Sequence, residues 1–183
     1  MRKTLLTFLV IALVLGGVYS AHAIHQTQVE GTKPVVPGAD AAKLYTFMTQ
    51  PKPYYDRFKL WPGTGKLYPG NQPHGSFLTT YVNDVALASI KEMKEMPDGA
   101  CIINEEYAAD KKLKALTVMY KVKGYNPETG DWFWVKYDSL NGYVLESGRV
   151  DSCIACHNAR KDNDYLFSKE ERKMGNYKNP DAH

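Results

Sequence analysis

Residues 113–137 read LKALTVMYKVKGYNPETGDWFWVKY, and this stretch decides the fold. Both of its ends, residues 113–123 and 131–137, are rich in the β-branched and aromatic side chains that favour strands. The segment between them, residues 124–130, has a glycine at each end and a proline inside, which is typical of a hairpin linker. Strands joined by so short a linker pair antiparallel. The stretch therefore predicts the centre of an antiparallel sheet.

Further strands extend this hairpin on both sides. Residues 76–82 and 100–107 precede it and share its strand composition, and residues 142–148 follow it. Pro97-Asp98-Gly99, just before the second of these runs, is a turn signal, since proline suits the first corner and glycine a position with positive φ. We expect these runs to join one sheet.

Helices and a loop complete the pattern. Residues 40–49 carry apolar side chains near a 3.6-residue period with Asp40 placed as N-cap, and Asn83-Asp84 can cap a short helix that ends near Met93. Residues 61–73 hold three prolines and three glycines and are predicted as loop. The sequence thus predicts an α+β fold: an antiparallel sheet with flanking helices, in one domain over residues 39–183 behind an extended lead-in, residues 24–38.

The first 23 residues are typical of an export signal. Arg2 and Lys3 precede an apolar run over residues 5–18, and Ala21-His22-Ala23 matches the small-x-small pattern that signal peptidase cleaves. An uncleaved anchor is the alternative, but the run is shorter than the roughly 20 residues that span a bilayer. We expect a signal peptide over residues 1–23, a periplasmic mature protein and no stable membrane anchor after cleavage.

The charge balance argues against partners that carry a dense negative charge. The 183-residue chain carries 23 basic and 20 acidic residues, and losing Arg2 and Lys3 with the signal lowers the net charge from +3 to +1. Such a balance provides no electrostatic footprint for nucleic acid or an acidic membrane surface. The remaining 160 residues suffice for one domain with a hydrophobic core.

The motif Cys153-Ile154-Ala155-Cys156-His157 is the attachment pattern of a c-type haem. Its thiols add to the porphyrin vinyl groups, the two-residue spacer places both sulfurs along one helical turn, and the histidine becomes an axial iron ligand. A structural zinc site would need four ligands, and the chain has no second Cys/His pair at ligand spacing. A thioredoxin-type pair would need a βαβ context. We predict one covalently attached haem c, on a C-terminal helix packed against the sheet.

The third cysteine, Cys101, lies in the apolar run Ala100-Cys101-Ile102-Ile103, where a thiol behaves as a small hydrophobe. With Cys153 and Cys156 assigned to haem, an intramolecular disulfide is excluded. We expect Cys101 to be buried and inert.

The other axial position of the iron decides between electron transfer and ligand binding. His74, in a Pro-His-Gly segment before a predicted strand, and Met119, inside a predicted strand, are the candidates; Met93 and Met96 lie near the end of the short helix. A surface or structural histidine and a packing methionine are the alternatives. The sequence leaves the coordination open.

Alternation along residues 100–107 defines two possible pocket faces. Ile102, Asn104 and Glu106 share one face, and Glu105 lies on the other. On the first face Asn104 would offer a neutral hydrogen-bond donor with Glu106 behind it. On the second, Glu105 would be a candidate proton carrier. Both carboxylates could also be solvated at a sheet edge.

The chain resembles the cytochrome P-460 family, which includes the gas-binding cytochromes c-prime beta. The resemblance implies an antiparallel sheet with helices beside it, one haem per chain and a homodimer. It is carried by ordered segments from residue 58 to residue 167: His74-Gly75, Tyr81-Val82-Asn83-Asp84-Val85-Ala86, Pro97-Asp98-Gly99-Ala100, Val118-Met119-Tyr120-Lys121, Asp131-Trp132-Phe133-Trp134, the C-x-x-C-H motif and Asn163-Asp164-Tyr165-Leu166-Phe167.

The resemblance also implies that residue 104 decides whether a lysine is bonded to the porphyrin. Family members that oxidise hydroxylamine have a lysine bonded to the porphyrin a few residues after the Pro-Asp-Gly turn, and here Asn104 stands at that position. An asparagine amide lacks the nucleophilic amine for such a bond. The alternative is that another lysine substitutes; those nearby are Lys111, Lys112, Lys114, Lys121 and Lys123.

Three functions follow as expectations. The first is binding of a small gaseous or nitrogen-oxide ligand, and the second is electron transfer with a redox partner protein. The third, oxidation of hydroxylamine or a related nitrogen compound, is disfavoured by Asn104. The scarcity of internal histidines argues mildly against a bis-histidine electron carrier.

Overall fold

The computed structural model describes residues 36–168. The predicted signal peptide and nearly all of the predicted lead-in lie outside the described residues. The helices are α1 (Ala41–Thr49), α2 (Tyr54–Arg57), α3 (Asp84–Glu92) and α4 (Asp151–His157), with 3-10 turns η1 (Pro127–Thr129) and η2 (Asn158–Asn163). The strands are β1 (Lys59–Leu60), β2 (Tyr68–Pro69), β3 (Phe77–Val82), β4 (Cys101–Tyr107), β5 (Leu113–Lys121), β6 (Trp132–Asp138) and β7 (Val144–Gly148).

The strands form one antiparallel sheet in the order β1-β3-β4-β5-β6-β7, with β2 also pairing with β3. The hairpin predicted from residues 113–137 forms β5 and β6, both inside the sheet, with Met119 opposite Trp134, while β4 and β5 are the central pair. Asn104 of β4 lies opposite Thr80 on one side and Thr117 on the other. The predicted α+β fold with an antiparallel sheet is confirmed.

Local signals place the helices as predicted. The Asp40 side chain accepts a hydrogen bond from the Lys43 N–H at 3.0 Å and caps α1, and Asn83 caps α3 by accepting from Ala86. In the Pro97-Asp98-Gly99 turn, Gly99 has φ of 82° and the Ala100 N–H donates to the Pro97 carbonyl. This turn lies directly before β4 and leads the chain into the sheet.

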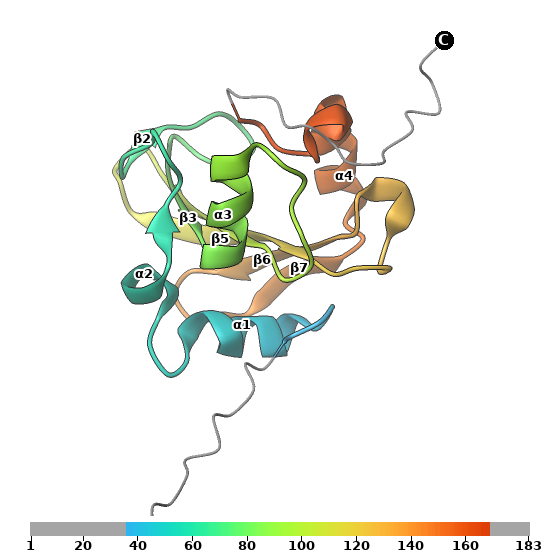
Figure 1. Ribbon diagram of the computed structural model, residues 1–183. Coiled ribbons are helices and arrows are strands. Elements are labelled where there is room, and N and C mark those ends of the chain that lie inside the picture. The colour runs from blue at the N-terminus through green and yellow to red at the C-terminus, as the bar shows by residue number, and fades with distance from the viewer. Residues whose placement is uncertain (1–35, 169–183) are drawn as a thin grey trace, which may run out of the picture. The chain divides into compact units, whose positions relative to one another are not determined.

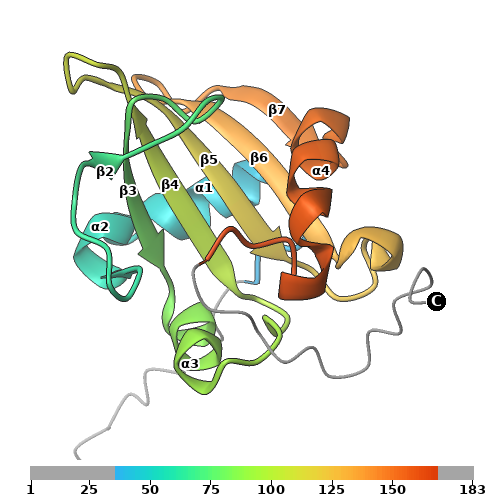
Figure 2. The ribbon, with the colours of Figure 1, turned by 90° about the horizontal axis from the view of Figure 1, so that it is seen from above.

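The sheet separates two layers (Figures 1 and 2). Helix α1 covers one face and packs on a closed apolar core, which includes Leu44, Ile103 and Val135. Helix α4 lies over the other face, and α3 lies at the ends of β3 and β4; both pack against a second core that is rich in tryptophan and methionine. Successive side chains of β4 therefore point in turn into the α1 layer and into the α4 layer.

The sequence missed three short elements. The two-residue strand β2 lies within the segment predicted as loop, while β1 and α2 lie just before it. Elements of two to four residues are too short for a hydrophobic period to develop. No helix within residues 36–168 is long and apolar enough to cross a membrane.

Candidate haem site

Helix α4 presents the cysteine motif at the molecular surface. None of its residues is buried; Cys153 is half-buried and Cys156 is exposed. Both are free thiols, and because they are three residues apart they lie on the same side of the helix. Burial raises the pKa of the Cys153 thiol. The helix thus offers two thiols along one edge, as attachment to two vinyl groups requires.

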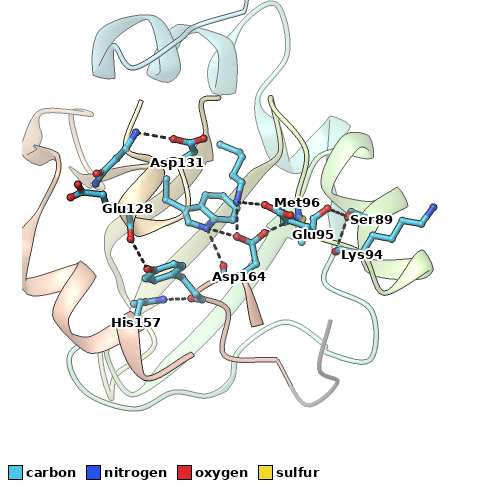
Figure 3. Close-up of polar contacts among 12 residues, drawn as sticks. Ser89, Lys94, Glu95, Met96, Glu128, Asp131, His157 and Asp164 are labelled. Atoms are coloured by element: carbon cyan, nitrogen blue, oxygen red, sulfur yellow. Dashed lines mark hydrogen bonds and ion pairs between the residues drawn. The ribbon is translucent and has the colours of Figure 1, made fainter. Parts of the chain in front are cut away.

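His157, the last residue of α4, is held in one orientation. Its Nδ1 lies 2.6 Å from the Tyr165 carbonyl oxygen, which can only accept, so Nδ1 carries the proton and donates (Figure 3). Burial lowers the pKa of the imidazole, although the bond to Tyr165 acts in the opposite direction. The ring is therefore neutral near pH 7, with Nε2 available as a metal ligand.

A buried polar cluster positions the Tyr165 carbonyl (Figure 3). Asp164 and Tyr165 have φ of 56° and 62°, a left-handed pair that turns the chain back toward α4. The Asp164 carboxylate binds the Lys121 ammonium at 2.5 Å and accepts the Met96 N–H at 2.7 Å. Trp132 donates its indole N–H to the Asp164 carbonyl at 3.0 Å. Sheet strands β5 and β6 thereby fix the group that orients His157.

A pocket lies between α4 and the sheet. Cys153, Cys156 and His157 line it from the helix. The sheet and the loop before β3 contribute a further set of side chains: His74, Ile102, Asn104, Thr117, Met119, Trp134 and Lys136. The indole nitrogen of Trp134 is buried without a hydrogen-bond partner among the described residues, and its ring centre lies 4.7 Å from that of His157.

These residues fit a c-type haem. Two free thiols, an imidazole with an open Nε2 and a wall of large apolar side chains are the groups that attach, ligate and enclose such a cofactor. The Trp134 N–H, which has no partner among the described residues, is one polar group in this otherwise apolar part of the wall.

Asn104 lies on this wall with its amide oriented. Its Oδ1 accepts from the Thr80 hydroxyl at 2.7 Å, and Thr80 in turn accepts from the Tyr68 hydroxyl. Because Oδ1 already accepts a hydrogen bond, the amide NH₂ remains as a donor. It has no hydrogen-bond partner within residues 36–168.

The two neighbouring glutamates separate, as strand alternation requires. Glu105 lies on the α1 side, where it accepts from the Tyr54 and Tyr107 hydroxyls, each at 2.7 Å, so it does not reach the pocket. Glu106 lies on the pocket side, where His74 Nδ1 is at 2.7 Å and Lys136 Nζ at 3.1 Å. Burial raises the pKa of Glu106, but these two partners outweigh it and hold the pKa below its ordinary value.

The structure thus brings together most of the predicted site residues. Asn104, Met119 and His74 line the pocket with the cysteine motif, Glu106 contacts His74, and Glu105 is directed away. Lys121 is committed to Asp164, and the other lysines considered for a cross-link are exposed outside the pocket lining: Lys111, Lys112, Lys114 and Lys123.

Three groups at the pocket were missed. Lys136 and Thr117 line it, and both share a strand face with residues that the sequence singled out, Trp134 and Met119. Period-two alternation could have found them. The Tyr165 carbonyl is a backbone group placed by a left-handed turn at two non-glycine residues, for which the sequence carries no signal.

The residues of this pocket fall within one recognised region. The family model described as Cytochrome P460 matches residues 56–168. The chain belongs to the cytochrome P460 family. Membership supports a c-type haem protein, and thus an iron site, in agreement with the groups that line the pocket. No curated protein matches the chain significantly.

Proposed function

We propose that this protein is a periplasmic cytochrome that transfers electrons through one haem c, attached at Cys153 and Cys156 with His157 as axial ligand. One observation carries the proposal: two thiols and an oriented imidazole line a single pocket whose cysteine edge is open to solvent. The haem, when bound, supplies one-electron iron chemistry. An exposed cysteine edge suits a carrier, since a redox partner can approach the ring there.

Each part of the chain has a task in this function. The thiols hold the cofactor, and the Tyr165 carbonyl holds the His157 tautomer and increases the basicity of Nε2. Ile102, Met119 and Trp134 exclude water from the pocket wall, which lowers the local polarity and so tunes the reduction potential. The signal sequence at residues 1–23 supports the periplasm as the compartment.

The porphyrin in this proposal carries no lysine bond. The family resemblance places Asn104 where the cross-linking lysine is expected, and the asparagine amide is not a nucleophile. Lys136, which does line the pocket, is paired with the buried Glu106. Glu105, a candidate proton carrier for hydroxylamine oxidation, points into the opposite layer. These placements argue against the enzyme and for the carrier, with a redox protein as partner and a homodimer as the assembly that the family resemblance implies.

A second function, binding of a small gaseous ligand, is favoured by one observation. The Asn104 NH₂ group lies at the pocket without a partner, while its oxygen is held by Thr80. Such a neutral donor would stabilise a bound diatomic molecule. If the protein binds carbon monoxide, Asn104→Ala should speed its release, whereas Thr64→Ala, in the loop after β1 and outside the pocket lining, should not.

The test begins with the protein exported from a host that matures c-type cytochromes. Intact mass should show loss of residues 1–23 and gain of one haem. The pyridine complex should be that of an ordinary haem c, and potentiometry should give one reversible one-electron step. Cys153→Ala/Cys156→Ala should abolish covalent haem. An abnormal pyridine complex would contradict the absence of a cross-link, and a wild-type protein that acquires no covalent haem would overturn the proposal.

A further inference from the structure

A second histidine, His74, lines the same pocket as His157. The ring centres of His74 and His157 are 6.1 Å apart, and their planes are nearly perpendicular at 84°. The two residues are far apart in sequence, in the loop before β3 and at the end of α4, and both line the same pocket.

Each imidazole has one nitrogen engaged and one open. His74 Nδ1 lies 2.7 Å from the Glu106 carboxylate, and His157 Nδ1 lies 2.6 Å from the Tyr165 carbonyl. Because both acceptors lack a proton at neutral pH, both Nδ1 atoms donate, which leaves Nε2 as the basic nitrogen of each ring. Neither Nε2 has a hydrogen-bond partner within residues 36–168.

The separation of the rings matches that of two imidazoles on one metal ion. A metal–imidazole bond is about 2 Å, and the nitrogen is about 1 Å from its ring centre, so two rings on opposite sides of an ion have centres about 6 Å apart. The observed 6.1 Å meets this condition. We propose that His74 is the second axial ligand of the haem iron, opposite His157. This inference rests on the haem attachment proposed above.

The loop that carries His74 is fastened to the sheet. The Ser76 N–H donates to the Tyr107 carbonyl at 2.9 Å, and the His74 N–H donates to Asn71 at 2.9 Å. Gly75, between them, has φ of 91°, and a Cβ there would lie 2.7 Å from the Tyr107 carbonyl oxygen. Only glycine permits this approach. His74 is thereby held at the end of β4, next to Glu106.

The partners of His74 are those that a ligand histidine needs. Glu106 is 3% exposed and is also bound by Lys136, so its carboxylate is fixed where it accepts the Nδ1 proton. A carboxylate behind a ligand histidine fixes the ring and increases the basicity of its other nitrogen. Thr117, whose hydroxyl is 3.5 Å from the same Nδ1, adds a second polar contact. Glu106 and Lys136 thus act as positioning residues for His74.

The inference decides between the two functions left open. Two strong protein ligands leave no site on the iron for a gas and favour electron transfer. Met119, the other predicted candidate, lies in the apolar cluster of Trp132 and Trp134 and packs there. The structure therefore favours a bis-histidine carrier, contrary to the argument from scarce histidines.

The experiment is electron paramagnetic resonance and near-infrared magnetic circular dichroism of the ferric holoprotein. The wild type should be low-spin with the charge-transfer signature of two imidazoles, and its ferrous form should not bind carbon monoxide promptly. His74→Ala should become high-spin and bind carbon monoxide at once, and added imidazole should restore the low-spin signal. His74→Met should stay low-spin with a raised reduction potential. Met48→Leu, in the core of the α1 layer and outside the pocket lining, is the control and should leave every spectrum unchanged. Met119→Leu should also stay low-spin.

Two outcomes would overturn the inference: a high-spin wild type, or a His74→Ala protein with the wild-type spectrum. Either can occur while intact mass and the pyridine complex show a normally attached haem c, so failure of the inference is distinguishable from failure of the proposed function. Loss of covalent haem in the wild type would instead remove the proposed function itself.

Discussion

The two faces of strand β4 differ in what they bury. Cys101, Ile103 and Glu105 face the α1 layer, where the apolar core is closed and Glu105 meets only tyrosine hydroxyls. Ile102, Asn104 and Glu106 face the α4 layer, where charged partners and an open pocket lie among the apolar side chains. Alternate residues of β4 therefore have different surroundings. One set packs in the core of the α1 layer, and the other set faces the candidate site.

The carboxylates of Glu105 and Glu106 make this difference explicit. Burial, and then the carboxylate of Glu105, raise the pKa of Tyr107 to about 12, so that this partner stays neutral. Glu106, by contrast, has its pKa lowered by His74 and Lys136 against the effect of burial. Glu105 therefore lies among neutral hydroxyl groups, whereas Glu106 lies beside basic side chains. We expect substitutions on the α1 face to change mainly the stability of the fold, and substitutions on the pocket face to change mainly the site.

The largest effect is expected from breaking the buried ion pair behind the pocket. Lys121→Met leaves the buried Asp164 carboxylate without its cation, which should lower the free energy of unfolding by about 3–5 kcal/mol. It should also loosen the Tyr165 carbonyl and alter the haem spectrum. Urea denaturation and absorption spectra measure the two effects.

The double variant Lys121→Met/Asp164→Asn provides the control for this pair, because it removes both charges and keeps the side-chain oxygen of residue 164 as an acceptor. It should recover a large part of the lost stability. A single variant as stable as the wild type would show that the pair contributes nothing.

A neighbouring pair on β4 tests the comparison directly. Ile103→Ala creates a cavity in the core of the α1 layer and should lower the free energy of unfolding by about 2–5 kcal/mol. It should leave the haem spectrum unchanged. Asn104→Ala, one residue further, should cost less than Ile103→Ala, because its side chain lines a pocket and is only partly buried. Thermal unfolding with parallel spectra measures both. If Ile103→Ala changed the spectrum, the two faces would not be independent.

The smallest effect concerns Cys101. Its side chain is fully buried, and burial raises the pKa of its thiol well above the ordinary value. In the folded holoprotein it should therefore not react with iodoacetamide at pH 8, and it should react once the protein is denatured. Mass spectrometry counts the label. Rapid labelling of the native protein would mean that the α1 face opens far more readily than its packing indicates.

Much of the fold could be predicted because its signals are local. The caps Asp40 and Asn83, the Pro97-Asp98-Gly99 turn and the alternation of residues 113–137 each act within a few residues, and each lies where it was expected. The expectation of a buried Cys101 is confirmed for the same reason, since its neighbours are apolar.

The site could be predicted only in part because its groups converge through the fold. The sequence offered Glu105 and Glu106 as alternatives, and only the register of β4 between β3 and β5 assigns Glu106 to the pocket. The meeting of His74 with His157 depends on how a loop and a terminal helix dock on the same sheet. No local pattern encodes a distance between residues so far apart.

The order of elements along the chain has a consequence for assembly. Every strand of the sheet precedes α4, so a chain that emerges N-terminus first can form its strands before the cysteines arrive. No residue of α4 is buried, although Cys153 and Ile154 pack against the second core. In the proposed haem protein, the cofactor would then be joined to a short segment at the surface, after the strands of the sheet have formed.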